Sequence, residues 1–224
     1  MQNWFPENVS TFGADIDEIF WFIFRITVVW FFITEGLILS FAIKYRRREG
    51  QRATYVKGNN RRQLAWILML GLIVLLLDLW IDIRGAQVWG KIKGQMPSSD
   101  LQVQITAKQF NWEIVYPGPD GKLGTGDDLQ LENELHVPVG KIVRIVLQSK
   151  DVIHSLFLPN LRLKQDAVPG REIHAWFEAT KPGKYEMPCA ELCGFGHSGM
   201  NGWLIVATPE DYEKWAKEHW SAEK

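Results

Sequence analysis

Two long apolar runs place the strongest limit on what this chain can fold into. The first spans roughly Ile19 to Ile43 and the second Leu64 to Ile81. Each is long enough to cross about 30 Å of hydrocarbon as a helix that rises about 1.5 Å per residue. Core helices of a soluble protein rarely stay apolar on every face over such a length. The runs therefore predict a transmembrane hairpin with helices at about residues 16–43 and 64–83.

The segment between the two runs is strongly basic. It contains a single acid, Glu49, and many cations: Lys44, Arg46, Arg47, Arg48, Arg52, Lys57, Arg61 and Arg62. The positive-inside rule places such a loop in the cytoplasm, so both termini are expected on the outer, periplasmic side of a bacterial inner membrane. The acidic residues before the first helix do not resemble the start of a signal peptide, and the sequence leaves open whether a precursor has lost one.

The pattern changes at about Asp100, where short β-branched and aromatic stretches begin to alternate with turn residues. This spacing is typical of an antiparallel sandwich or barrel. Strands are expected at residues 101–106, 141–147, 155–158, 172–177, 184–187 and 202–206. The chain then divides into residues 1–95, with the membrane hairpin, and residues 96–224, with the β domain.

Two shorter stretches complete the predicted architecture. Residues 117–128 are rich in Gly, Pro and Asp, which predicts a surface hairpin. Their spacing misses the Asp-x-Asp-x-Asp-Gly pattern of a calcium loop, so calcium is the weaker alternative. A C-terminal helix is expected to begin with Thr208 as its N-cap, Pro209 at the first helical position and Asp211 as the capping acid.

Both cysteines of the chain fall in one window, Cys189-Ala-Glu-Leu-Cys-Gly-Phe-Gly-His-Ser-Gly-Met200. His197 lies in the same window, and His154, at the start of a predicted strand, offers a second imidazole. Soft thiolate and thioether donors combined with imidazole select copper over hard cations. The other histidines lack such a context and are expected as surface or core residues: His136, His174 and His219.

Three simpler kinds of site compete for these donors. A disulfide between Cys189 and Cys193 suits the oxidising side of a membrane, but it leaves His197 and Met200 without a role. Zinc bound by both cysteines, His154 and His197 has the usual ligand count, yet it leaves out Met200. A mononuclear blue-copper site needs only one cysteine. A two-copper centre is the alternative that uses every donor.

The motif Cys-x-Glu-x-Cys-x-x-x-His-x-x-Met, with Asp-Val-Ile-His-Ser at residues 151–155, resembles subunit 2 of cytochrome c oxidase, the CuA-containing subunit of haem-copper oxidases. The resemblance extends to residues 135–140, 163–171 and 181–185 and to the helical hairpin, and thus to most of the chain. It implies that an all-β, cupredoxin-like Greek-key sandwich follows the hairpin.

The resemblance also implies roles for the matching residues. Cys189 and Cys193 would bridge two coppers, and His154 and His197 would each bind one. Met200 and the backbone carbonyl of Glu191 would be weak axial ligands. The side chain of Glu191 would face a magnesium ion shared with the catalytic subunit.

A chain of this family is expected to be the electron-entry subunit of a terminal oxidase, an oxidoreductase and translocase. The resemblance implies three partners: a haem-copper catalytic subunit that reduces oxygen, a c-type cytochrome or other periplasmic carrier, and the lipid membrane. Nucleic acid is not expected as a partner, and no catalytic residue is expected in this chain. Electron entry is expected at Phe110 and Trp112.

The chain departs from the family pattern at two positions. Phe110 stands where many members carry tryptophan, and Gln63 stands where many carry a glutamate that serves a proton channel. These departures leave open a CuA-containing subunit of a nitric oxide reductase. A membrane-tethered electron-transfer or copper-binding module without a catalytic partner is also left open. The complete donor set disfavours a quinol oxidase subunit that has lost its copper.

Overall fold

A computed structural model describes residues 5–222 of the chain. Their contacts divide the chain into two units. One unit spans Asp15–Lys91, and the other joins the segment that ends at Ala14 to everything from Ile92 onward. By their contacts, residues 5–14, which precede the apolar part of the first helix, belong to the same unit as the β domain.

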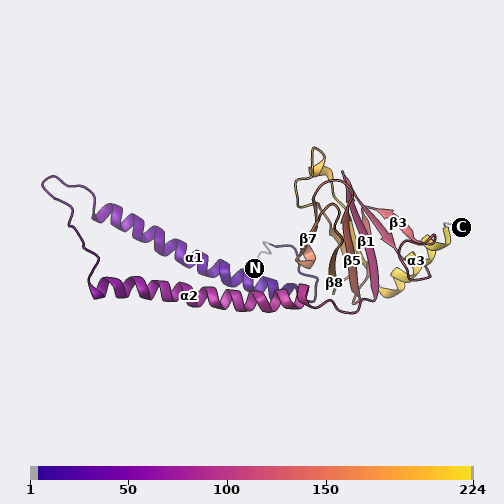
Figure 1. The fold of residues 1–224 in the computed structure, drawn as a ribbon, viewed down its shortest axis with the longest axis horizontal. Coiled ribbons are helices and arrows are strands. Elements are labelled where there is room, and N and C mark those ends of the chain that lie inside the picture. The colour runs from indigo at the N-terminus through magenta and orange to yellow at the C-terminus, as the bar shows by residue number, and fades with distance from the viewer. Residues whose placement is uncertain (1–4, 223–224) are drawn as a thin grey trace. The chain divides into compact units, whose positions relative to one another are not determined.

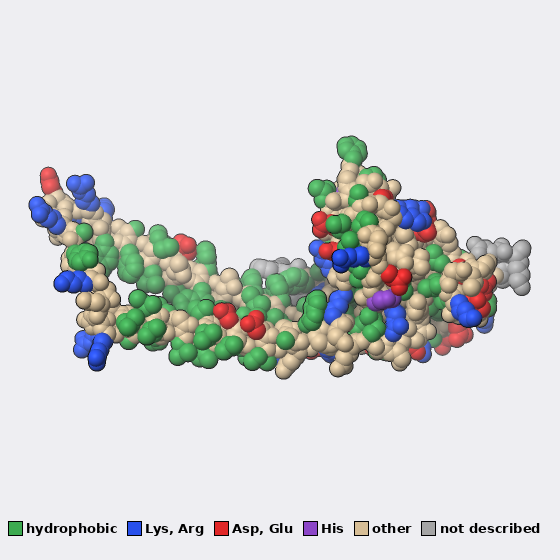
Figure 2. All heavy atoms as spheres, viewed as in Figure 1, with side chains coloured by type: hydrophobic (Ala, Val, Ile, Leu, Met, Phe, Trp, Pro, Cys, Tyr) green, Lys and Arg blue, Asp and Glu red, His purple; other side chains and the backbone are tan. Residues whose placement is uncertain are grey.

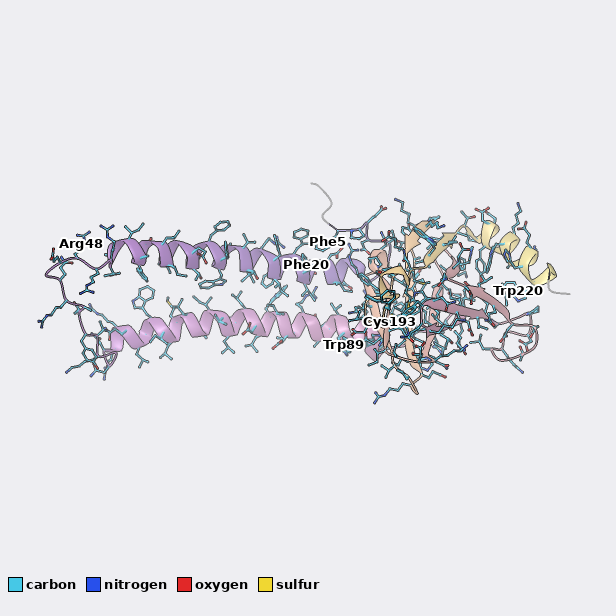
Figure 3. The ribbon with its side chains drawn as sticks, turned by 90° about the horizontal axis from the view of Figure 1, so that it is seen from above. Phe5, Phe20, Arg48, Trp89, Cys193 and Trp220 are labelled. Atoms are coloured by element: carbon cyan, nitrogen blue, oxygen red, sulfur yellow. The ribbon has the colours of Figure 1, made fainter. Side chains whose placement is uncertain are left out.

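The first unit contains α1 (Gly13–Lys44) and α2 (Arg61–Trp89), which run alongside each other as a hairpin (Figures 1 and 3). The rings of Phe22 and Trp80 meet between them, with centroids 3.8 Å apart. By length and composition both helices are able to cross a membrane. Most of their large apolar side chains are exposed, so the hairpin does not form a core of its own. The predicted pair of apolar helices is confirmed.

Charged side chains occur both in the segment between the two helices and on the helices themselves. Figure 2 shows Lys and Arg gathered over the segment between the helices. Asn60 ends that segment and caps α2, because its side-chain oxygen accepts a hydrogen bond from the Arg62 N–H over 3.0 Å. Glu35 on α1, and Asp78 and Asp82 on α2, are exposed carboxylates among apolar neighbours.

The second unit is a β-sandwich with a C-terminal helix (Figure 1). Its largest sheet has the order β3 (Leu129–Glu132), β2 (Asn111–Tyr116), β1 (Leu101–Lys108), β5 (Ile142–Ser149) and β8 (Ile173–Glu178). A second sheet has the order β4 (Glu134–Pro138), β10 (Trp203–Ala207) and β9 (Gly183–Glu186). A third pairs β6 (His154–Leu158) with β7 (Leu163–Ala167).

The expected sandwich is confirmed, but the expectation of purely antiparallel pairing is wrong. β1 pairs with β5 in parallel, as β4 does with β10, while the other ladders are antiparallel. Parallel strands need a crossover rather than a tight hairpin, and other strands intervene within each parallel pair. Alternation of apolar and polar residues reveals which face of a strand is buried, but not the direction of its neighbour.

The buried side chains come from alternate positions of facing strands. They include Val103, Ile105, Leu135, Val137, Ile145, Leu147, Leu204 and Val206. Six strands lie within one or two residues of their predicted bounds, while β2, β3, β4 and β7 were not anticipated. β7 shows why, because its sequence Leu-Lys-Gln-Asp-Ala is buried only at the two ends.

The stretch between β2 and β3 is a surface hairpin loop, as predicted. β2 and β3 pair antiparallel on either side of it. The carboxylates of Asp127 and Asp128 accept hydrogen bonds from the N–H groups of Asp120 and Gly124, over 3.3 and 2.6 Å. The acidic side chains of this loop therefore close its own turns.

The predicted capping of the C-terminal helix is also present. α3 spans Pro209–Ala222, and the Thr208 hydroxyl accepts a hydrogen bond from the Asp211 N–H while donating one to its carboxylate. The helix contacts the β domain through Trp215, which stacks on the His136 ring at 4.3 Å between centroids. Burial lowers the pKa of His136. The imidazole of His136 is thus a packing group, as the sequence indicated.

Candidate metal centre

The cysteine window lies in the long connection between β9 and β10 and is anchored on β6. Cys189 forms an antiparallel bridge with Leu156, and the Ala190 N–H donates to the Ser155 carbonyl over 2.9 Å. The two ends of the window also meet, because the Cys189 N–H donates to the Met200 carbonyl over 3.0 Å. The window is therefore a closed loop, fixed beside the strand that begins with His154.

This arrangement gathers the soft donors around two sulfurs. The sulfurs of Cys189 and Cys193 lie 3.9 Å apart inside the β domain, where Figure 3 labels Cys193. His154 Nδ1 lies 3.9 Å from the Cys189 sulfur, and His197 Nδ1 lies 3.5 Å from the Cys193 sulfur. Each imidazole thus approaches a different sulfur. His154, Cys189 and Cys193 form a possible metal site, with ligand atoms within 4.8 Å of one another.

Two weaker donors approach the same sulfurs. The Met200 sulfur lies 3.8 Å from that of Cys193, and the Glu191 carbonyl oxygen lies 3.3 Å from that of Cys189. The side chain of Glu191 is exposed. The structure therefore places every predicted metal ligand in one cluster, formed by β6 and one loop.

Both cysteines are free thiols in this structure. Their separation of 3.9 Å far exceeds a disulfide bond of about 2.05 Å. It fits two sulfurs on the same ion, because metal–sulfur bonds are about 2.3 Å long. Burial, together with the neighbouring Cys189, raises the pKa of Cys193 to about 11. A metal ion must therefore displace the proton of the Cys193 thiol in order to bind.

His154 is oriented by a carboxylate that the sequence did not single out. His154 is fully buried, and its Nε2–H donates to Asp151 Oδ1 over 2.8 Å. Asp151 also accepts hydrogen bonds from the N–H groups of Val152 and Gln109, over 2.6 and 2.7 Å. Burial alone would raise the pKa of Asp151, but the bonds from His154, Gln109 and Val152 outweigh it and lower that pKa. The Nδ1 atom of His154 is therefore left to face the cysteines.

Gln109 and Phe110 connect β1 and β2 to the cysteine loop. The Gln109 side-chain amide donates to the Cys193 carbonyl over 2.6 Å. The ring of Phe110 lies so close to Gly196 that a Cβ there would stand 2.4 Å from it. Gly194 has φ of 134° and also faces Phe110. A side chain at Gly194 or Gly196 would crowd Phe110, so the close approach of the loop to Phe110 explains these two glycines.

The structure separates the two aromatic residues that were expected to receive the electron. Phe110 is 38% exposed at the surface. Trp112 is completely buried, and its ring lies 6.2 Å from that of His154 between centroids. Phe110 is thus accessible at the surface, whereas Trp112 lies inside the domain beside a candidate ligand.

Apolar side chains are exposed around this centre. Leu192 is 78% exposed and Phe195 is fully exposed, both within the cysteine loop. Val152 and Ile153, which directly precede His154, are partly exposed as well. Figure 2 shows hydrophobic side chains at the tip of the β domain, over the yellow-orange loop of Figure 1. We call Phe110, Leu192, Phe195, Val152 and Ile153 the apolar tip.

Comparison with known proteins matches this domain and most of the chain. Residues 102–207 match the model of the family "Cytochrome C oxidase subunit II, periplasmic domain". Cytochrome c oxidase subunit 2 of Thermostichus vulcanus is 31% identical over 96% of this chain and 78% of its own length. Alternative cytochrome c oxidase subunit 2 of Bradyrhizobium diazoefficiens is 30% identical over 96% and 84%.

Solved structures resemble the β domain. The periplasmic domain of cytochrome oxidase subunit II of Bradyrhizobium japonicum is 30% identical, with a TM-score of 0.52 over 58% of this chain and all of that chain. A mixed disulfide between a thioredoxin-like protein and subunit II of cytochrome c oxidase has a TM-score of 0.50 at 28% identity, over 59% of this chain and 99% of that one.

These relatives are oxidase subunits, and they do not favour the nitric oxide reductase alternative. Their similarity runs through both units, since the two curated relatives align with nearly the whole chain. The chain belongs to the cytochrome c oxidase subunit 2 family, whose members are subunits of an oxidoreductase complex, the haem-copper oxidases.

Proposed function

We propose that this chain is the electron-entry subunit of a haem-copper terminal oxidase. It takes electrons from a c-type cytochrome or a similar periplasmic carrier at a binuclear copper centre. It passes them to haem in a separate catalytic subunit, where oxygen is reduced to water. The observation that carries this proposal is the cluster of two thiols, two imidazoles and a thioether.

The donor set fits a pair of copper ions better than a single ion. Each imidazole approaches a different sulfur, and the two sulfurs lie close enough for two metal ions to share both of them. Thiolate and thioether are soft donors, which copper prefers. A copper pair bound here would supply one-electron transfer. The residues that would hold it are His154, Cys189, Cys193, His197 and Met200, together with the carbonyl oxygen of Glu191.

The protein contributes rigidity around these ligands. Asp151 fixes the orientation of His154, and the Gln109 side chain holds the backbone at Cys193. The loop ends are tied to each other and to β6. A cage held in this way changes little in shape when an electron arrives, which favours fast transfer.

The apolar tip is proposed as the surface that receives the electron carrier. Its residues neighbour the ligands, since Leu192 precedes Cys193 and Phe195 lies two residues before His197. An exposed apolar patch of this kind marks a site of protein association. The electron would enter at Phe110, and Trp112 would lie between that surface and His154.

We expect Phe195→Ser to lower kcat/KM for the reduced carrier by roughly tenfold, the effect of losing about 1.4 kcal/mol of docking energy. Phe195 is fully exposed, so neither folding nor copper content should change. Phe195→Leu is the matched control and should retain most of the rate. Stopped-flow reduction by a c-type cytochrome measures the effect, and an unchanged rate in Phe195→Ser would remove the docking role.

The exposed apolar and acidic side chains suggest how the chain would contact the membrane, the catalytic subunit and a magnesium ion. α1 and α2 would span the inner membrane with the basic segment in the cytoplasm and the β domain in the periplasm. Charged groups within a bilayer usually face protein, so Glu35, Asp78 and Asp82 are proposed to face the catalytic subunit. The exposed Glu191 carboxylate is available for a magnesium ion at that interface.

Copper loading requires both thiols in the reduced state. A relative of this chain forms a mixed disulfide with a thioredoxin-like protein. We propose that a thiol reductant of this class keeps Cys189 and Cys193 reduced before the metal binds, because the periplasm would otherwise oxidise so close a pair.

Metal analysis and spectroscopy of the purified complex test the proposal. A pair of copper ions per chain is expected, with the electron paramagnetic resonance pattern of one unpaired electron shared between two coppers. Reduction by a c-type cytochrome should precede oxygen uptake. Zinc, a single copper, or a stable disulfide in the active complex would contradict the proposal, and turnover with nitric oxide instead of oxygen would revise the acceptor.

A further inference from the structure

The residues ahead of α1 behave as part of the β domain. We call residues 5–12 the N-terminal segment. The Val9 N–H donates to the Asn160 carbonyl over 2.8 Å, and the Thr180 N–H donates to the Val9 carbonyl over 2.8 Å. Ser10 forms an antiparallel bridge with Ala179. The segment thus lies as an extended peptide between η2 (Pro159–Leu161) and the end of β8.

Two side chains of the segment enter the core of the domain. Val9 and Phe12 are buried, with 1% and 0% of their surfaces exposed. The Phe12 ring meets the Trp176 ring edge to face, with centroids 5.5 Å apart. The Ser10 hydroxyl donates to the Leu161 carbonyl over 3.0 Å. Apolar anchors spaced three residues apart therefore supplement the backbone pairing.

Polar contacts extend the docking toward the start of the segment. Asn160 Nδ2 donates to the Glu7 carbonyl, and an Arg162 guanidinium N–H donates to the Pro6 carbonyl, each over 2.9 Å. Lys181 pairs with the Glu7 carboxylate over 2.8 Å, with both side chains more than half exposed. The exposed ion pair contributes little, so Val9 and Phe12 dominate the docking energy.

We propose that the β domain contains a docking site for the N-terminal segment, between η2 and the end of β8, and that the domain is complete only when this segment occupies it. The site recognises an extended peptide by strand addition, with pockets for an aliphatic and an aromatic side chain.

Hydrogen exchange of the full chain in detergent tests the docking. Peptides that cover residues 5–12 should exchange at least about tenfold more slowly than those covering residues 45–60, because bonded amides open only with their domain. Both segments flank α1, so a protective effect of the micelle would act on both. Equal, fast exchange in the two segments would overturn the proposal.

A core substitution distinguishes docking from chance proximity. Phe12→Ala should lower the melting temperature of the β domain by about 10 °C, the usual effect of deleting a buried aromatic ring. It should also speed exchange at residues 159–162 and 178–181, but not at residues 45–60. Glu7→Gln removes only the exposed ion pair, and should leave both quantities nearly unchanged.

Phe12→Leu is expected to recover part of the lost melting temperature. If Phe12→Ala left the melting temperature and the exchange at residues 159–162 unchanged, the segment would not belong to the domain. If Phe12→Ala does not accumulate, the exchange of the unaltered chain decides the matter. Neither measurement depends on copper or electron transfer, so failure here is distinguishable from failure of the proposed function.

Discussion

Replacing Cys193 by serine is expected to abolish electron entry and to remove the copper pair. The sulfur of Cys193 lies near the sulfurs of Cys189 and Met200 and near His197 Nδ1. A serine hydroxyl is a hard donor that stays protonated at neutral pH, so it cannot replace a shared thiolate. We expect oxygen consumption with a reduced c-type cytochrome to fall more than about 100-fold, since even outer partners of a ligand contribute about 10–100-fold.

The control for this change lies in the same loop. Ser198 is exposed, and Ser198→Ala should leave copper content and turnover unchanged. Because Cys193 is buried, the serine also leaves a polar group in the core, at a cost of about 1–3 kcal/mol. Circular dichroism therefore has to accompany the assay to show that the domain is folded. Normal oxygen consumption by a folded Cys193→Ser variant would refute the assignment of the centre.

Replacing Asp151 by asparagine is expected to weaken copper retention by about 10–100-fold without removing any ligand. One carboxylate oxygen of Asp151 accepts from His154 and Val152, and the other accepts from Gln109. An amide has a single acceptor oxygen, so its NH₂ group must face one of these donors. It also lacks the negative charge that makes the His154 imidazole more basic and therefore a stronger metal ligand.

A second histidine–carboxylate pair offers the matched control. His174 Nε2 lies 3.3 Å from a carboxylate oxygen of Glu172, and both side chains are exposed. Glu172→Gln should leave copper binding unchanged. Competition with a chelator measures copper retention, and the electron paramagnetic resonance spectrum should shift in Asp151→Asn. Equal retention in Asp151→Asn and the unaltered chain would show that His154 is oriented without its carboxylate.

The site shows which part of the chemistry depended on local sequence. Most of the donors lie within one window, and the donor types alone indicate copper. His154 was identified through its motif, and the structure places it beside Cys189. The orienting roles of Asp151 and Gln109 were missed. Asp151 lies only three residues before His154, so its role could have been inferred from the sequence. Gln109 lies far from Cys193 in the sequence and becomes its neighbour only in the folded domain.

The same division holds for the fold. Length and hydropathy were sufficient to predict the apolar helices, because a membrane-spanning helix satisfies its backbone locally and needs only an apolar surface. Capping by Thr208 is similarly local. The parallel pairing of β1 with β5 was not predictable, because three strands (β2, β3 and β4) lie between them along the chain. Periodicity reports the burial of a strand, but not its partner.

The sequence by itself determined the set of candidate metal ligands, the pair of long apolar helices and the family resemblance, because each depends on residue types at short spacing. Only the tertiary structure decided that Trp112 is buried while Phe110 is exposed, and that Val9 and Phe12 belong to the β domain. Those facts depend on packing between segments far apart in the sequence, as Trp112 lies beside His154 and Phe12 meets Trp176. Such packing follows from shape and burial across the whole domain, which no short pattern contains.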